Sequence, residues 1–247
     1  MVLSANQLEA IRQFYHGRFA YVLEATSASA KITVPTERAK YFFTDGPRFI
    51  GEHFQLIKQC RAAAEKYQGR PPAFPWHVLN MDATETDGEA DGFEMDATQA
   101  YIRAAALLKI FPRRLLARLR KTDKQYRLRI MGAIAARRQV EEYDHEGNLT
   151  ARRDIFSRRG VAAWKAICAR VSLDLAGVAA RDTGFLAFWV DNYYTTNRAA
   201  APLLRENYKV KIKPCRFRWK SDELQTRFWI TDCATGKVKP FIFPRRK

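Results

Sequence analysis

The stretch Phe93-Glu-Met-Asp96-Ala-Thr-Gln-Ala-Tyr101-Ile-Arg103 combines the end of a predicted strand with the start of a predicted helix. A short apolar segment precedes Asp96, whose carboxylate lies at the junction between the predicted strand and helix. Strong helix formers follow directly. Asp at such a junction either caps the helix, which is its ordinary role, or holds a divalent cation. Tyr101 follows on the next helical turn, where its ring would form a wall beside that ion.

A second carboxylate ends another predicted strand. In Gly184-Phe-Leu-Ala-Phe-Trp-Val-Asp191-Asn-Tyr-Tyr-Thr195 an apolar run ends on Asp191, and Asn192 and two tyrosines follow. This pattern predicts a buried strand, a tight turn and a returning strand. Two such strands can bring Asp96 and Asp191 together, as a two-metal phosphoryl-transfer site requires, where the ions lie about 3.5–4 Å apart.

These two stretches resemble motifs of a known family. Asp96 with Tyr101 is similar to motif A of the family B DNA polymerases, an Asp followed by a Ser-Leu-Tyr-Pro-like segment. Trp189-Val-Asp191-Asn-Tyr193 is similar to their motif C, the Tyr-x-Asp-Ser hairpin. The resemblance covers roughly residues 92–215 and depends on order and spacing more than on residue identities.

A third motif lies between them. Lys124-Gln-Tyr-Arg-Leu-Arg-Ile-Met-Gly132 has the Lys-to-Gly spacing of the fingers helix of that family, Lys-x3-Asn-Ser-x-Tyr-Gly. Leu128 and Arg129 stand where the family has Asn-Ser, and Met131 replaces its Tyr. The segment belongs to a strongly basic block that is predicted to be helical.

The resemblance implies an α+β fold with a polymerase-type palm, an antiparallel sheet backed by helices, and with a basic helical fingers insertion and flanking N-terminal helices. It implies templated nucleotidyl transfer with Mg2+ or Mn2+ held by Asp96 and Asp191. Tyr101 would form the wall that selects deoxyribose. The residues expected to hold the deoxynucleoside triphosphate are Lys124, Arg127 and Lys121.

The choice of the first metal ligand has an alternative, because Met-Asp-Ala-Thr occurs at both 81–84 and 95–98. Only the second copy is followed by a helical segment and a suitably placed tyrosine, which favours Asp96 over Asp82. Asp82-Ala-Thr-Glu85 does not have the spacing of a proofreading Asp-x-Glu motif, and we expect no exonuclease domain. The acidic cluster in this region is interpreted as a solvated hairpin loop; its residues are Asp82, Glu85, Asp87, Glu89, Asp91 and Glu94.

The net charge indicates a polyanionic partner. The chain has 43 Lys and Arg against 26 Asp and Glu, a formal charge of +17. Such an excess favours DNA or RNA and predicts salt-dependent binding, although a generically basic protein would share it. In segment 209–220, cations alternate with apolar residues, which predicts one cationic face along a phosphate backbone or an ordinary charged sheet edge. The residues expected to contact nucleic acid are Arg113, Arg114, Arg118, Lys209, Lys211, Lys213, Arg216 and Arg218.

Proline and helical patterns suggest the domain organisation. Amphipathic helices are predicted over residues 4–25, 47–67 and 158–180, the second with Phe54, Ile57, Cys60 and Ala64 on its apolar stripe. The proline cluster at 69–75 marks a boundary. The predicted regions are a helical N-terminal region (1–70), a palm (76–195) whose fingers insertion (112–155) ends in a hairpin, and a basic β-rich region (196–247).

The sequence gives no support for a membrane protein, a zinc-binding protein or a disulfide-rich protein. No apolar run approaches the length of a membrane span, and no signal peptide opens the chain, so we expect no membrane association. Four scattered cysteines without a C-x-x-C pair argue against a zinc site or a disulfide framework. A cytoplasmic compartment, including the nucleoid or the cytoplasm of a host, is expected.

Two alternatives to an active DNA polymerase stay open. A reverse transcriptase also has an aromatic residue five positions after an Asp in its motif A, but this chain has no Gly-x-Pro-Gln-Gly segment and no second Asp beside Asp191. The other alternative is an inactive palm that binds nucleic acid or a replication or packaging partner. The divergent fingers motif and the small size of the chain support that alternative.

Overall fold

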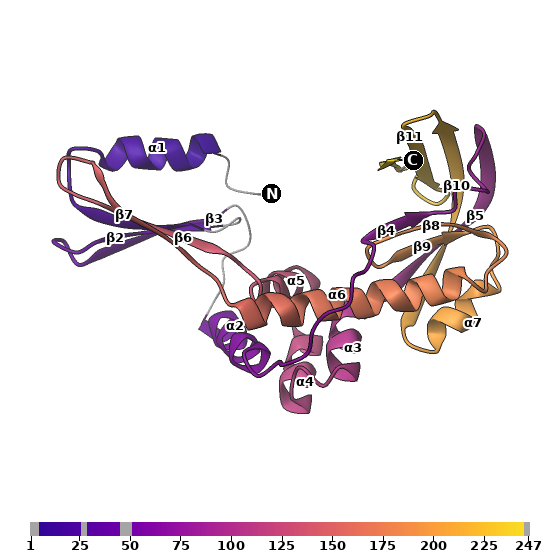
Figure 1. The fold of residues 1–247 in the computed structure, drawn as a ribbon, viewed down its shortest axis with the longest axis horizontal. Helices are drawn as coiled ribbons and strands as arrows, with labels where there is room; N and C mark the ends of the chain where they lie inside the picture. Colours follow the sequence, from indigo (N-terminus) through magenta and orange to yellow (C-terminus); the bar gives the residue numbers. More distant parts are fainter. Residues whose placement is uncertain (1–4, 26–28, 45–50, 245–247) are drawn as a thin grey trace. The chain divides into compact units, whose positions relative to one another are not determined.

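The chain forms two compact units in the computed structural model, which describes residues 5–25, 29–44 and 51–244 (Figure 1). Unit 1 comprises Met1–Gly69 and Ile110–Trp164, and unit 2 comprises Arg70–Lys109 and Lys165–Lys247. Each unit is therefore built from two separate stretches of the chain. The long helix α6 (Arg158–Ala179) begins in the range of unit 1 and ends in that of unit 2.

Unit 1 contains a five-stranded antiparallel sheet with the strand order β3-β2-β1-β6-β7. Its strands are β1 (Tyr21–Ala25), β2 (Ser29–Val34), β3 (Ala39–Thr44), β6 (Arg138–Tyr143) and β7 (Leu149–Ile155). Helix α1 (Ala5–Tyr15) packs on one face through Ile11 and Tyr15, which join Tyr21, Leu23 and Ile32 in a buried cluster. The hairpin predicted at 139–155 is present, and it completes a sheet that the N-terminal strands begin.

The prediction of one helix over residues 4–25 was wrong, because the helix ends at Tyr15 and β1 follows. Gly17 adopts a left-handed φ of 68°, a conformation that ends helices at little cost for glycine. Beyond it, Tyr21 and Leu23 point inward with a period of two, and β1 is hydrogen-bonded to both β2 and β6. The N-terminal region is consequently a mixture of helices and strands.

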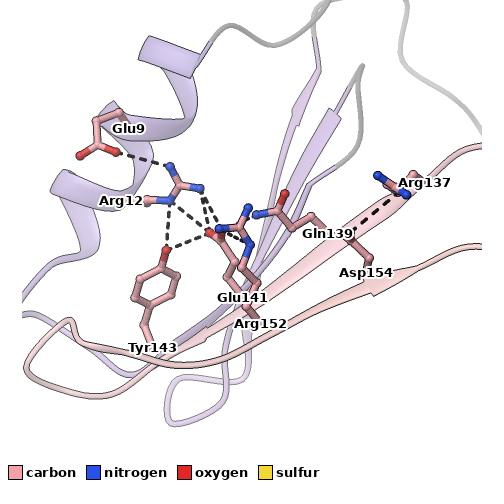
Figure 2. A network of polar contacts seen from close by, with 8 residues as sticks. All are labelled: Glu9, Arg12, Arg137, Gln139, Glu141, Tyr143, Arg152 and Asp154. Atoms are coloured by element: carbon pink, nitrogen blue, oxygen red, sulfur yellow. Dashed lines mark hydrogen bonds and ion pairs between the residues drawn. The ribbon is translucent and has the colours of Figure 1, made fainter.

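A buried carboxylate links α1 to the sheet of unit 1 (Figure 2). Glu141 on β6 is 3% exposed and accepts hydrogen bonds from Arg12 Nη2 at 2.8 and 3.1 Å and from Arg12 Nε at 3.1 Å. Tyr143 donates its hydroxyl to the same carboxylate at 2.8 Å, and Gln139 donates to it as well. Arg152 lies further away, with its Nε 3.8 Å from Glu141 Oε1. The charge of Glu141 is therefore stabilised inside unit 1 chiefly by Arg12.

The remaining helices of unit 1 are α2 (Gly51–Ala64), α4 (Arg113–Lys121) and α5 (Lys124–Gly132). Cys60 and Ala64 are buried on α2 as predicted, but Phe54 is 55% exposed, so its assignment to the core was wrong. Leu56, which the predicted stripe omitted, is buried in its place. The predicted first turn around Pro47 lies outside the described residues. The side chain of Asp123 caps α5 by accepting from Gln125 N at 2.8 Å.

Unit 2 contains a seven-stranded sheet with the order β12-β11-β10-β5-β9-β8-β4, in which every described pairing is antiparallel. Its strands are β4 (His77–Leu79), β5 (Gly88–Thr98), β8 (Phe185–Trp189), β9 (Asn192–Thr195), β10 (Lys209–Ser221), β11 (Gln225–Asp232) and β12 (Val238–Pro244). Helices α3 (Ala100–Leu107) and α7 (Ala200–Arg205) complete the unit with the C-terminal part of α6. The predicted α+β class with antiparallel sheets is confirmed.

The sheet of unit 2 curls until its two edges meet. Ring contacts join β12 to the opposite edge, with Trp189 5.0 Å from Phe241 and His77 5.6 Å from Phe243. The concave face encloses a core whose buried members are Leu79, Leu186, Ala187, Tyr194, Cys215, Phe217, Trp219, Phe228, Ile230 and Phe243. Helices α6 and α7 lie along the other side of the sheet (Figure 1). Among the described helices of the whole chain, none is long and apolar enough to cross a bilayer.

Candidate active site

Asp96 lies inside strand β5 and does not cap the following helix. Strand β5 extends to Thr98, and Gln99, with a left-handed φ of 59°, is the N-cap residue of α3. Met95 and Ala97 on either side of Asp96 are buried, whereas Asp96 itself is half-buried. The ordinary capping role considered for Asp96 is therefore excluded, and its carboxylate is available on one face of the sheet.

Asp191 lies in the two-residue turn between β8 and β9. Val190, the other turn residue, has a φ of 60°, which is a strained conformation for a β-branched side chain. Its N–H donates to Trp76 O at 3.0 Å, which helps to hold the turn in this conformation. Asn192 Nδ2 donates to Asp191 Oδ1 at 3.2 Å and orients the carboxylate. Strained backbone of this kind is typical of functional sites.

Sheet pairing brings Asp96 and Asp191 together at one end of β5 and β9. Asp96 is directly opposite Asn192, and Ala97 N donates to Asp191 O at 3.1 Å. Directly opposed residues of antiparallel strands have Cα atoms about 4.5–5.5 Å apart and project to the same face. Asp96 and Asn192 therefore lie on the concave face, and the Asp191 carboxylate contacts the Asn192 side chain at its end.

The pKa values of two tyrosines, the half-buried Tyr101 and the buried Tyr194, are affected by these carboxylates. Burial raises the pKa of Tyr101 far above its ordinary value, and the negative charge of Asp191 raises it further. Burial likewise raises the pKa of Tyr194, with contributions from Glu94, Asp191 and Asp96. Tyr101 therefore lies within electrostatic range of Asp191 and of Cys168 on α6, and both rings remain protonated at neutral pH.

Glu94 is a further carboxylate on the face of β5 that carries Asp96, and sequence reasoning missed its role. It was assigned to a solvated acidic loop, but it is 2% exposed on β5, two residues before Asp96. Lys239 Nζ on β12 donates to its two oxygens at 2.8 and 3.1 Å, and Lys213 Nζ lies 4.0 Å away. The signal available in the sequence was the two-residue spacing from Asp96, which places both side chains on one face.

Replacing Lys239 by Met should destabilise unit 2 by about 2 kcal/mol, because Glu94 would stay buried with only a distant cation. The half-exposed position of Lys239 keeps this value below that of a fully buried pair. Urea unfolding followed by tryptophan fluorescence measures the effect, since unit 2 contains Trp76, Trp189, Trp219 and Trp229.

Two further variants control this measurement. The exposed Lys237→Met change removes the same charge two residues earlier and should cost less than about 0.5 kcal/mol. Adding Glu94→Gln to Lys239→Met should recover most of the loss, because the uncompensated charge disappears. Equal stability of wild type and Lys239→Met would contradict the assigned ion pair.

The prediction of a single cationic face on β10 was wrong. Pairing of β10 with β5 runs without a register shift through Pro214, so the two-residue alternation continues across it. Lys209, Lys211 and Lys213 consequently share the concave face with the buried Cys215, Phe217 and Trp219, and Arg216 and Arg218 project from the opposite face. Lys211 is directly opposite Asp96, which places a cation beside the carboxylate pair.

The arginines on the other face of β10 have neighbours of their own. Arg216 Nε donates to the exposed Asp91 at 3.2 Å, and Arg218 lies 6.0 Å from the ring centre of Trp229. An exposed ion pair such as that of Arg216 contributes little to stability, so this guanidinium can exchange its partner for a phosphate.

The expected triphosphate-binding residues belong to unit 1. Lys121 and Lys124 are exposed at the end of α4 and the start of α5. Arg127 is half-buried, and its Nη1 donates to Thr122 O at 3.0 Å between these helices. The carboxylates of Asp96 and Asp191 belong to unit 2. Binding of a triphosphate by these three cations therefore stays a prediction.

The three arginines of α4 that are expected to contact nucleic acid differ in whether other side chains already bind them. Arg113 and Arg114 are exposed in the first turn of the helix. Arg118 is instead bound to α2, where its guanidinium donates to Gln59 at 2.9 Å and lies 3.5 Å from Glu52. Arg113 and Arg114 are therefore the better placed for phosphate contacts.

Asp82 is less suitable than Asp96 as a partner of Asp191. It is exposed in the turn after β4, the edge strand that pairs with β8 and is separated from β5 by two strands. Within the described part of the chain, no group of three or more His, Cys, Asp or Glu residues is arranged to hold a metal ion. Any metal site at Asp96 and Asp191 would therefore take its remaining ligands from substrate, water or backbone oxygens.

Comparison of the chain with protein-family models, curated proteins and solved structures finds no match. The functional argument therefore depends on the geometry of the site.

Proposed function

We propose that the protein is a templated nucleotidyltransferase that extends a nucleic-acid primer with deoxynucleoside triphosphates by a two-metal mechanism. The observation that carries this proposal is the pairing of Asp96 with Asn192, directly after the turn residue Asp191, on adjacent antiparallel strands. The likeness of this strand and hairpin to polymerase motifs A and C supports the same interpretation. The net charge of +17 supports DNA or RNA as template.

The residues at the site fit Mg2+ or Mn2+. Mg2+ is usually bound through one or two carboxylates together with substrate phosphates and water, so two aspartates suffice without a third protein ligand. Bound there, such ions would stabilise the negative charge on the attacking and leaving oxygens of an in-line displacement. Glu94 is held by Lys239 and is assigned a structural role beside these ligands.

The protein's own residues would perform the other steps. Asn192 orients the Asp191 carboxylate, and Lys211 supplies a positive charge next to Asp96. Tyr101 would pack against the sugar of the incoming nucleotide and exclude a 2′-hydroxyl group. Lys121, Lys124 and Arg127 would hold the triphosphate.

Replacing Tyr101 by Ala should leave incorporation measurable but reduce discrimination against ribonucleotides about tenfold or more, because the wall is removed. Tyr101→Phe keeps the ring and should discriminate as wild type does. The measurement compares kcat/KM for a deoxynucleotide with that for the matching ribonucleotide. A discrimination ratio that is the same in all three proteins would exclude Tyr101 as the sugar wall.

Primer extension by the full-length protein, with deoxynucleotides and Mg2+ or Mn2+, tests the proposed function. Extension that follows the template sequence supports it. If wild type is inert on DNA and RNA templates with both metals, the proposal fails, and the fold would be interpreted as an inactive scaffold for nucleic acid or a replication or packaging partner.

A further inference from the structure

A cluster of arginines lies in unit 1, where the hairpin β6–β7 meets α2 and the start of α6. We call them the hairpin-base arginines: Arg61, Arg137, Arg138, Arg158 and Arg159. Arg61 Nε on α2 donates to Ala133 O at 3.1 Å, just before the hairpin. Arg159 Nη1, just after the hairpin, donates to Glu65 O at 3.0 Å, one turn beyond Arg61. These contacts gather residues from distant parts of the sequence at one place.

Nearby acids neutralise only part of this charge. Arg137 lies 4.0 Å from Asp154, and Arg138 lies 2.8 Å from Glu24, which also binds Lys31 at 2.7 Å. Within the described part of the chain, Arg137 and Arg138 are thus the members of this cluster with a carboxylate within 4.0 Å. Burial lowers the pKa of Arg61, and the charge of Arg138 lowers it further, which is the effect expected where like charges are crowded. A polyanion would relieve this repulsion.

An exposed aromatic ring accompanies the arginines. Phe156 directly follows β7 and is 43% exposed, and the Arg137 guanidinium lies 5.5 Å from its ring centre. A solvent-exposed ring among cations is the combination that single-stranded nucleic acid requires, because unpaired bases stack on aromatic side chains while cations contact the phosphates. A duplex keeps its base faces stacked inside and offers nothing to this ring.

We propose that the hairpin-base arginines and Phe156 bind single-stranded nucleic acid, with the guanidinium groups on phosphates and the phenyl ring stacked on a base. The choice of nucleic acid as partner rests on the proposed function. Binding at this surface nevertheless requires neither metal nor nucleotide. A single strand here would be a template or displaced strand bound by residues that do not belong to the carboxylate site.

Fluorescence anisotropy of a labelled oligothymidine, compared with a duplex of the same length, tests the proposal with the full-length protein in metal-free buffer. Arg137→Gln combined with Arg158→Gln should weaken single-strand binding about tenfold and lower the salt slope by about 1.4, at about 0.7 per phosphate contact. Phe156→Ala should weaken single-strand binding about fivefold or more and change duplex binding less than twofold.

A matched control removes the same charge elsewhere. Lys40→Gln combined with Lys237→Gln replaces two exposed lysines and should change single-strand affinity less than twofold. The proposal is overturned if this control loses as much affinity as the arginine variant, or if Phe156→Ala affects neither probe or both equally. This measurement uses neither metal nor nucleotide, so a failure of the proposed chemistry and a failure of this surface give different results.

Discussion

Replacing Asp191 by Asn should abolish nucleotide incorporation, with a loss of about a thousandfold or more. The substitution preserves the size of the side chain but removes the charge that would hold a divalent cation. Metal stabilisation of transition-state charge is worth several kcal/mol, and each 1.4 kcal/mol corresponds to a tenfold change in rate. Asp96→Asn should have an effect of the same order. Single-turnover primer extension with Mg2+ and with Mn2+ measures both losses.

Asp82→Asn is the matched control for this experiment. It makes the same chemical change in the repeated Met-Asp-Ala-Thr segment, but at an exposed position after β4, which two strands separate from β5. Its incorporation rate should stay within twofold of wild type. A loss at Asp82 with full activity at Asp96 would assign the catalytic carboxylate to the first copy of the segment and contradict the proposed site.

Replacing Arg12 by Met should destabilise unit 1 by about 2–3 kcal/mol. The change leaves the Glu141 carboxylate buried without its principal cation, and breaking a buried ion pair from one side costs about 3–5 kcal/mol. The side chain of Arg12 is 29% exposed, which reduces the expected loss. Hydrogen exchange of β1 and β6 in increasing urea measures the stability of unit 1 separately from that of unit 2.

Arg152→Met provides the control on the same carboxylate. Arg152 is 61% exposed and lies 3.8 Å from Glu141, so its removal should cost less than about 1 kcal/mol. Equal losses for the two variants would show that Arg12 does not dominate the stabilisation of Glu141.

Low pH should reduce the difference between wild type and Arg12→Met. Burial alone would raise the pKa of Glu141, but hydrogen bonds from Arg12 and Tyr143 outweigh it and lower the pKa below its ordinary value. A carboxylate whose pKa is lowered by folding contributes stability above its unfolded value of about 4.3, and this contribution is lost as the pH falls through the folded value. A difference that stays constant from neutral pH to pH 3 would contradict this assignment.

The sequence was sufficient to predict most elements of unit 2. Apolar residues recur in its strands and helices with a clear period, and these segments end abruptly. Examples are the apolar run before Asp191 and the apolar stripe along α6. The strand that contains Asp96 and the turn that carries Asp191 followed from these local patterns, although β5 continues past Asp96 to Thr98. The sheet pairs Asp96 with Asn192, next to Asp191, and the sharing of a metal by the two carboxylates stays a prediction.

The sequence was not sufficient where pairing between distant segments decides the structure. Residues 19–23 fit a helical stripe as well as a strand, and only the hydrogen bonds of β1 to both β2 and β6 select the strand. Glu94 resembled the solvated acids before it, and its burial depends on Lys239 from the last strand of the sheet. The face of each β10 lysine depended on whether Pro214 interrupts the ladder, which the register with β5 decides.

Binding of Mn2+ tests the central claim most directly, because it examines the carboxylate pair without requiring catalysis. Titration of the full-length protein with Mn2+, followed by the loss of the free-ion electron paramagnetic resonance signal, should reveal a site that Asp96→Asn and Asp191→Asn each weaken. Asp82→Asn should bind Mn2+ as wild type does. If the double variant Asp96→Asn with Asp191→Asn binds Mn2+ as tightly as wild type, the two aspartates do not form a metal site and the account is contradicted.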